Sequence, residues 1–450
     1  MNENRTESVF FNRLFELFIC VFYTWYFLPI CNVLLPNDRY KLIFFCFFAI
    51  GFVGLFLIGG IRINTVMVAV LSYIVVFTLL FVRGFGDISS HIRVSFTFWG
   101  TAILYFGILK EDSRRRIGKY LIFLFLITVV TSSIGVFIDN SAARTIAHAG
   151  ADDALQASYK MKNIGSIYLF QGLVFSVPML ICMPKNKLQR VISIFLLVAV
   201  LAVLLNASFT ISLLLFFVAM FLSVTQSKNS INRIILTGVF GVLAVALLYN
   251  MSDILLFLSS VIDNYKITDK LYEASKIFSG DVLTGDVAER LELYKVSLNT
   301  FSQNLLGTGA HYSYIKFEDN IGYHSQLFDD LARYGLFALA YYITFLTGYF
   351  IHMKEQWKKV DCARIAGIIT VIYAMFLTLN LGFRSSEESV LMLFILPVLP
   401  DILVKWKEKK AQKKEEGIAV NENTVYNPKA DVFGRTENDG VDCKSNGKKR

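Results

Sequence analysis

Residues 191–222 read VISIFLLVAVLAVLLNASFTISLLLFFVAMFL and include no Asp, Glu, Lys or Arg. The stretch contains two apolar spans, at about 189–205 and 207–224, with a tight connection around Asn206 between them. A helix needs about 20 apolar residues to cross the hydrocarbon core of a bilayer. The run therefore predicts two consecutive membrane-spanning helices.

Similar apolar runs occur along most of the 450 residues. The chain is 55% hydrophobic and 18% charged, with a mean hydropathy of +0.54, whereas a soluble domain is about a quarter charged. The runs lie at about 14–35, 41–60, 64–83, 92–109, 119–139, 164–183, 189–205, 207–224, 233–250, 335–353, 364–383 and 388–404. We therefore expect an all-α polytopic membrane protein with about 12 transmembrane helices.

The basic residues predict how these helices are oriented. Cytoplasmic loops of membrane proteins carry an excess of Lys and Arg, and the densest cluster lies between Lys110 and Lys119. Counting spans alternately from that cluster places the other strong basic clusters on the same side. We therefore expect a multi-pass protein of the cell membrane with both termini in the cytoplasm. These loops and the tail explain the net charge of +9, so it does not indicate a nucleic-acid partner.

The same count divides the chain into four parts. Residues 1–250 would hold transmembrane helices 1 to 9, with an outer loop at about 140–163. Residues 251–334 would form a large, partly helical extracytoplasmic loop that carries the active site, and residues 335–404 would hold helices 10 to 12. Residues 405–450 are polar, charged and poor in aromatic residues, which predicts a disordered basic cytoplasmic tail.

Several classes of function lack support in the sequence. The apolar spans contain almost no charged residues, which argues against a coupled transporter, because charges inside a membrane mark ion and proton pathways. The six cysteines show no CxxC or pairing pattern, so we expect no disulfide framework or metal site. Motifs typical of hydrolases, NTPases and nucleotide-sugar enzymes are absent. Asp329 and Asp330 are adjacent on an expected helix and would point in diverging directions, so they do not predict a cation site.

The outer loop contains a clear signal for a helix. Asp286-Val-Ala-Glu289 has the pattern of a capping box, and apolar residues follow at spacings of three and four. Arg290 and Tyr294 are four residues apart, so they are neighbours on this helix. We expect the helix to end near Gly307-Thr-Gly309, where glycine permits a positive φ.

A second helix is expected to begin near residues 320–322, with His324 in its first turn. The positive end of the helix dipole disfavours an imidazolium, which keeps His324 neutral and able to act as a base. The free amides at that end suit an anion such as a diphosphate. Taken singly, however, Arg290 is more often a solvated or ion-paired arginine, and His324 more often a capped surface histidine.

Four short stretches occur in a fixed order within residues 288–337. They are Ala288-Glu-Arg290-Leu-Glu-Leu-Tyr294, Phe301-Ser-Gln-Asn-Leu-Leu-Gly307-Thr-Gly309, His324-Ser325 and Leu331-Ala-Arg-Tyr-Gly335-Leu-Phe337. This order resembles the signature of the O-antigen polymerase and ligase superfamily. In that family an Arg, followed four residues later by an aromatic residue, precedes a Gly-x-Gly, then a His-Asn, then a Gly that opens the next span.

The sequence departs from the family pattern at three places. Tyr294 stands where the family has Trp, and Ser325 stands where it has the Asn of His-Asn. The short motif that often contains Ser-Arg corresponds to residues 206–212, which contain no arginine. Upstream, Asn163 is similar to the family's Asn at the outer entrance of a span, and Arg144 would be the arginine that precedes it.

The resemblance implies a glycosyl transfer at the outer face of the cytoplasmic membrane. Polyprenyl-diphosphate-linked oligosaccharide repeat units would be joined into a capsule, an exopolysaccharide or an O-antigen. His324 would be the catalytic base and Arg290 the catalytic clamp on the departing diphosphate. The expected substrate-binding residues are Arg144, Asn163, Tyr294, Gly307, Gly309 and Arg384. No metal or other cofactor is implied, because the leaving group is already activated.

The expected partners are the lipid-linked oligosaccharide, the lipid bilayer, a chain-length regulator and a flippase. Two alternatives stay open at this point. The protein could transfer a finished glycan onto a lipid or wall anchor, as an O-antigen ligase does, or it could be a non-enzymatic flippase or transporter of the same lipid-linked glycan. Loss of a polymerase leaves single units attached, whereas loss of a ligase leaves long chains on the carrier lipid.

Overall fold

The computed structural model describes most of the chain. The described residues are 3–35, 38–83, 96–147, 152–183, 185–207, 210–225, 251–261, 268, 272, 275–276, 286–309, 321–380 and 386–423. All regular elements among them are helical, as expected. The expected span at 233–250 and the candidate residue Arg384 lie outside these residues.

Five helical segments are long and apolar enough to cross a membrane, which agrees with a helical membrane protein. They occupy residues 39–59 in α3 (Asp38–Gly59), α7 (Glu111–Ile138), α12 (Lys187–Asn206), α19 (Leu336–Lys358), and residues 387–409 at the C-terminal end of the apolar region. Large apolar side chains on their surfaces face outward, including Leu57 at 75% exposed and Phe195 at 72% exposed. Such surfaces suit a lipid environment.

Other apolar runs form shorter helices of 10–17 residues, or two helices in succession. The run at 14–35 is divided between α1 (Glu3–Phe27) and α2 (Pro29–Leu34), because Pro29 has no N–H with which to extend α1 and suits the first turn of a new helix. The run at 164–183 is divided into α10 (Ile167–Val174) and α11 (Ser176–Cys182).

Three runs include a short π-helical stretch. Their elements are α4 (Thr65–Ser72), η1 (Tyr73–Phe77) and α5 (Thr78–Arg83); η2 (Ile103–Ile108); and α21 (Ser386–Val390), η4 (Leu391–Ile395) and α22 (Leu396–Asn423). The hydropathy pattern does not reveal these changes in helical pitch, because side chains remain apolar through them.

One buried charge lies within the first apolar run. Glu16 of α1 is 5% exposed, and both of its carboxylate oxygens accept hydrogen bonds from Arg116 of α7. Ser113 also donates to the carboxylate, at 2.6 Å. A buried carboxylate requires such partners, so this ion pair joins α1 to α7.

The contacts divide the chain into two compact units, Met1–Leu403 and Val404–Arg450. In the second unit, α22 continues as a helix to Asn423, within the tail that the composition predicts to be disordered. Lys, Glu, Gln and Ala have high helix propensities, and Lys405 pairs with Glu408 one turn later, at 2.9 Å. Residues 424–450 lie outside the described part of the chain.

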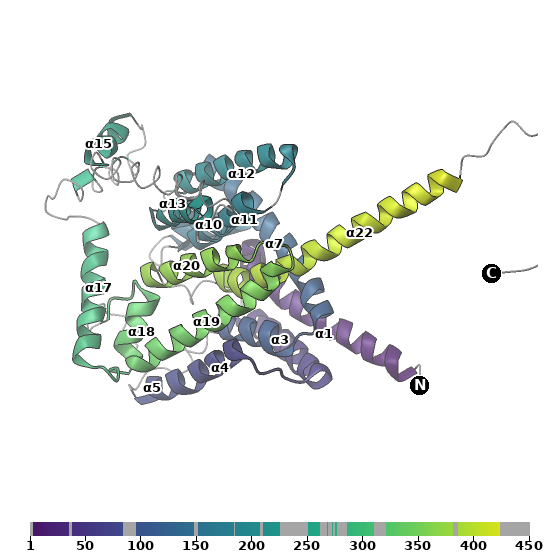
Figure 1. Ribbon diagram of the computed structural model, residues 1–450. Coiled ribbons are helices and arrows are strands. Elements are labelled where there is room, and N and C mark those ends of the chain that lie inside the picture. The colour runs from purple at the N-terminus through teal and green to yellow at the C-terminus, as the bar shows by residue number, and fades with distance from the viewer. Residues whose placement is uncertain are drawn as a thin grey trace, which may run out of the picture. The chain divides into compact units, whose positions relative to one another are not determined.

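The expected helices of the polar segment are present in the first unit. They are α17 (Asp286–Gln303) and α18 (Gln326–Tyr334), which pack against each other (Figure 1). α18 also contacts α19, α20 (Arg364–Leu379) and α5. α17 begins at Asp286, where the capping-box pattern predicts a helix start, although the side chains of residues 286–288 lie outside the description.

Candidate functional site

The glycine-rich turn after α17 packs against the end of α18 through the backbone. Thr308 donates its N–H to the carbonyl of Ala332 at 3.1 Å, and Gly309 donates to Arg333 at 2.9 Å. Gly307 has φ +82°, and a Cβ there would lie 2.3 Å from the Arg333 carbonyl oxygen. The position therefore requires glycine both for its conformation and for the close approach of two backbones.

Gly335 makes the reciprocal approach. It has φ +62°, and a Cβ there would lie 2.1 Å from the carbonyl oxygen of Leu305. Leu336, the first residue of α19, donates its N–H to that same carbonyl at 2.9 Å. Gly307 and Gly309 thus act in joining α17 to the end of α18, with the Gly309 amide bonded to protein backbone. Their contact with a substrate stays a prediction.

The segment that carries His324 lies against α17. Gly322 donates its N–H to Ser297 Oγ at 2.9 Å, and Ser297 Oγ donates to Asp329 Oδ1 at 2.7 Å. A Cβ at Gly322 would lie 2.1 Å from the carbonyl oxygen of Leu293, which shows how closely the two backbones approach. Gly322, two residues before His324, therefore holds this segment next to α17.

His324 does not lie in the first turn of α18, and that expectation is corrected here. Ser325 is the N-cap, because its hydroxyl accepts the N–H of Phe328 at 3.1 Å, so the helix begins at Gln326. Serine is a preferred N-cap residue, which accounts for a Ser after this His. His324 Nδ1 lies 3.3 Å from the carbonyl oxygen of Gly322. A carbonyl only accepts, so this hydrogen bond forms when Nδ1 carries the proton, and that tautomer leaves Nε2 as the basic nitrogen.

Arg290 and Tyr294 occupy consecutive turns of α17, as the spacing predicts. The Tyr294 hydroxyl donates to the carbonyl of Leu379 at 2.9 Å, and its ring meets Phe328 edge to face with centroids 5.7 Å apart. Burial raises the pKa of Tyr294, although the neighbouring Arg290 guanidinium opposes that rise. Tyr294 therefore remains a neutral hydrogen-bond donor, and Arg290 lies half-buried beside it.

Both helices of the pair are fastened to the same end of α20. Tyr294 of α17 binds the Leu379 carbonyl, and the Gln326 N–H of α18 donates to the carbonyl of Asn380 at 2.9 Å. These two carbonyls are consecutive along the chain. The arrangement brings Arg290, Tyr294 and the His324 segment onto one supporting structure, and the chain then continues towards Arg384, which lies outside the described residues.

A buried ionic network in α18 was not recognised from the sequence. Asp330 Oδ2 accepts hydrogen bonds from Gln326 at 2.8 Å and from the Tyr342 hydroxyl, and Arg333 Nη1 lies 3.9 Å from Asp330 Oδ1. Asp330 and Arg333 are 2% and 8% exposed. Burial raises the pKa of Asp330 to about 6, against the attraction of Arg333 and these hydrogen bonds.

Arg333 is the cation of this network. Burial disfavours its charge, yet the nearby Asp329, Tyr334 and Asp330 raise its pKa. Its guanidinium carbon lies 4.9 Å from the centroid of the Tyr323 ring. Tyr323 has φ +59°, a left-handed conformation that bulky residues rarely adopt. The sequence does contain a signal for this network. Asp329 and Arg333 have opposite charges and are four residues apart, just before Gly335 and an apolar run.

Arg144 and Asn163 belong to a different part of the first unit. Arg144 lies on α8 (Ala142–Ala147), which packs with α7, α9 (Asp153–Met161) and α10. Asn163 has φ +56° and exchanges two hydrogen bonds with Thr131 of α7, at 2.8 and 3.1 Å. The other amide atom of Asn163, its Oδ1, is buried and has no hydrogen-bond partner among the residues that the structure describes. The expected binding residues therefore fall into two groups, one on α17 and α18 and the other around α8 and α9.

Neither a protein-family model nor a curated protein sequence matches this chain.

Proposed function

We propose that the protein is a glycosyltransferase that polymerises polyprenyl-diphosphate-linked oligosaccharide repeat units at the outer face of the cell membrane. The observation that carries the proposal is that Arg290, Tyr294 and the His324 segment are fastened together on α17 and α18, next to the end of α20. The proposal includes about 12 membrane spans with cytoplasmic termini, as the basic residues predict.

Arg290 has the chemistry required at the leaving group. When the anomeric C–O bond of the donor breaks, negative charge develops on the diphosphate. A guanidinium stabilises such charge through two parallel N–H donors. Tyr294 positions Arg290, since its ring and its hydroxyl are both held in place by neighbouring helices.

His324 has the chemistry required at the acceptor. The sugar hydroxyl of the second repeat unit loses its proton to Nε2 while its oxygen forms the new bond to the anomeric carbon. The hydrogen bond between Nδ1 and the Gly322 carbonyl sets the tautomer that makes Nε2 basic. The resulting imidazolium returns its proton to water after the product leaves, so atoms and charge balance.

The test is polymerisation by purified protein in vesicles that contain a polyprenyl-diphosphate repeat unit. We expect Arg290→Ala to lower the rate by about 10²–10³-fold, the usual effect of losing one charge-stabilising donor. We expect His324→Ala to lower it by about 10²–10⁴-fold. Lys295→Ala is the matched control, because Lys295 is a cation on the same helix that pairs with Glu292 at 2.5 Å on the exposed face.

The products identify the reaction. A ladder of lengthened glycans on the carrier lipid supports the polymerase. Transfer of a whole glycan to an anchor, with no ladder, would instead establish a ligase. Glycan movement across the vesicle membrane without any new glycosidic bond would establish a transporter. Long chains in both Arg290→Ala and His324→Ala would show that the assignment of this site is wrong.

A further inference from the structure

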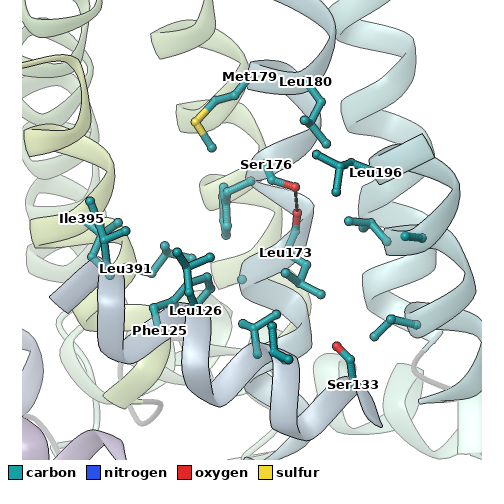
Figure 2. A pocket seen from close by; sticks show the side chains of 18 of the residues that line it. Phe125, Leu126, Ser133, Leu173, Ser176, Met179, Leu180, Leu196, Leu391 and Ile395 are labelled. Carbon is teal, nitrogen blue, oxygen red and sulfur yellow. Dashed lines mark hydrogen bonds between the residues drawn. The ribbon is translucent and has the colours of Figure 1, made fainter. Parts of the chain in front are cut away.

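A cavity of about 630 Å³ lies between α7 and α12, and hydrocarbon lines almost all of it. α10, α11, η4 and the start of α22 complete its walls. Figure 2 shows Phe125 of α7, Leu173 of α10 and Leu391 of η4 directed into it. The polar side chains in the lining are Ser133 and Ser176, and the Ser176 hydroxyl donates to the backbone of Leu173 at 2.6 Å. Among its described lining residues none is charged, so the cavity suits an apolar chain.

A second cavity, of about 620 Å³, lies at the C-terminal ends of the same two helices and is polar. Its lining includes Asp139 and Asn140 at the end of α7, Lys162 after α9, and Asn206 at the end of α12. Phe137 lines both cavities. The two cavities therefore adjoin along α7, one apolar and the other polar, and we treat them as the apolar end and the polar end of one candidate site.

The polar end holds one charge of each sign. Asp139 Oδ1 accepts hydrogen bonds from the Ser141 N–H at 2.9 Å and its hydroxyl at 2.7 Å, and Oδ2 accepts one from the Tyr159 hydroxyl. These donors stabilise the carboxylate, and the bond to Asp139 raises the pKa of Tyr159. The ammonium of Lys162 lies 5.9 Å from the centroid of the Tyr159 ring. The pocket therefore presents an anion bonded to the hydroxyl of Tyr159 and a cation near the ring of the same residue.

We infer that this site binds one zwitterionic membrane phospholipid with a phosphoethanolamine headgroup. An acyl chain occupies the apolar cavity, the phosphate pairs with Lys162, and the ammonium pairs with Asp139. A carboxylate held by three donors disfavours a headgroup that carries only negative charge. The inference does not depend on the proposed function, since it concerns α7 and α12 rather than α17 and α18.

The apolar end is tested by filling it. Full-length protein is reconstituted in vesicles of equal phosphatidylethanolamine and phosphatidylglycerol with a minor amount of polyprenyl phosphate, extracted in mild detergent, and analysed by native mass spectrometry for retained lipid. Ala199→Trp places a large ring in the cavity, and we expect about tenfold less retained phosphatidylethanolamine, since each buried methylene contributes to affinity. Val198→Trp is the matched control, because Val198 precedes it on α12, is 60% exposed and is not in the cavity lining. Equal retention by the two variants would overturn the inference.

The polar end is tested by removing one charge. Asp139→Asn keeps the size of the side chain and removes the partner of the ammonium. We expect this variant to retain as much total phospholipid as the unchanged protein while losing its preference for phosphatidylethanolamine. An unchanged preference, or displacement of phosphatidylethanolamine by the scarce polyprenyl phosphate in the unchanged protein, would overturn the choice of ligand. Since the readout is lipid retention, either result is independent of glycan polymerisation.

Discussion

The α17–α18 pair and the α7–α12 site both combine polar and apolar groups, but they are built differently. In the first, carbonyls and amides of separate segments bond to each other, and Asp330 and Arg333 are almost completely buried. In the second, α7 and α12 border an apolar cavity, and Asp139 and Lys162 line the polar cavity next to it. Buried charges and close backbones tolerate little movement, whereas an apolar cavity accommodates a flexible chain. The rigid α17–α18 pair therefore suits the positioning of reacting groups, and the cavity of the α7–α12 site suits lipid binding.

Removing a cation should have very different effects in the two regions. Arg333→Ala leaves Asp329 and Asp330 buried without their cation, and we expect the free energy of unfolding to fall by about 3–5 kcal/mol. Lys162→Ala removes an exposed cation, and we expect a change below about 1 kcal/mol. Thermal unfolding in detergent measures both. Similar shifts in Tm would show that the two regions do not differ in this way.

Stability should depend on pH through the first region. The pKa of Asp330 is raised from 3.8 to about 6, so the folded protein binds more protons than the unfolded chain between these values. The contribution of this group therefore falls as pH rises through that window, by about 3 kcal/mol at most, since one pKa unit corresponds to ~1.4 kcal/mol. Unfolding measured from pH 4 to pH 6.5 tests this, and Asp330→Asn should show a flatter profile. A parallel profile in that variant would assign the dependence to another group.

Glycines in the two regions should respond differently to an added methyl group. Gly335 has φ +62° and faces a backbone carbonyl, so we expect Gly335→Ala to lower the free energy of unfolding by about 1–3 kcal/mol. Gly172 lies in α10, and its nearest neighbour would be the terminal methyl Cδ2 of Leu391, at 2.8 Å. Because that side chain can rotate and alanine favours a helix, we expect Gly172→Ala to change stability by less than about 1 kcal/mol. The same unfolding measurement compares them.

The two tyrosines give the smallest contrast. Tyr294→Phe leaves the Leu379 carbonyl without its donor, and we expect a loss of about 1–2 kcal/mol. Tyr159→Phe removes a bond to Asp139, whose carboxylate keeps two other donors and lies in an open pocket, so we expect less than about 1 kcal/mol. A larger loss in Tyr159→Phe would reverse the order of the two regions.

Local sequence patterns predicted the elements well. Apolar runs predicted helices, Asp286 marked the start of α17, and Gly307 marked the turn after it. The helix before Gly335 was expected to continue into the next span, but Gly335 has φ +62° and separates α18 from α19. The position of His324 was predicted less well, because Ser325 competes for the N-cap and starts α18 two residues later than His324. Capping depends on which hydroxyl reaches a free amide, and hydropathy does not record that.

The candidate site could be predicted only in part. The spacing of Arg290 and Tyr294 was sufficient to make them neighbours, since a helix repeats every 3.6 residues. Leu379, whose carbonyl accepts the hydrogen bond of Tyr294, is 85 residues away from it in the sequence. No local pattern indicates a contact between residues so far apart, and the same applies to the carbonyl of Asn380. The same holds for the grouping of Arg144 and Asn163 with α7 and α9 rather than with α17.

Helical character, apolar surfaces and the order of motifs follow from the amino-acid sequence of this protein, because hydrophobicity, helix propensity and glycine conformation act over one or two turns. The burial of Asp330 with Arg333 and the cavity between α7 and α12 depend on the packed structure. Charge pairing and cavity shape arise between segments that are distant in sequence, and their energies exist only once those segments are packed.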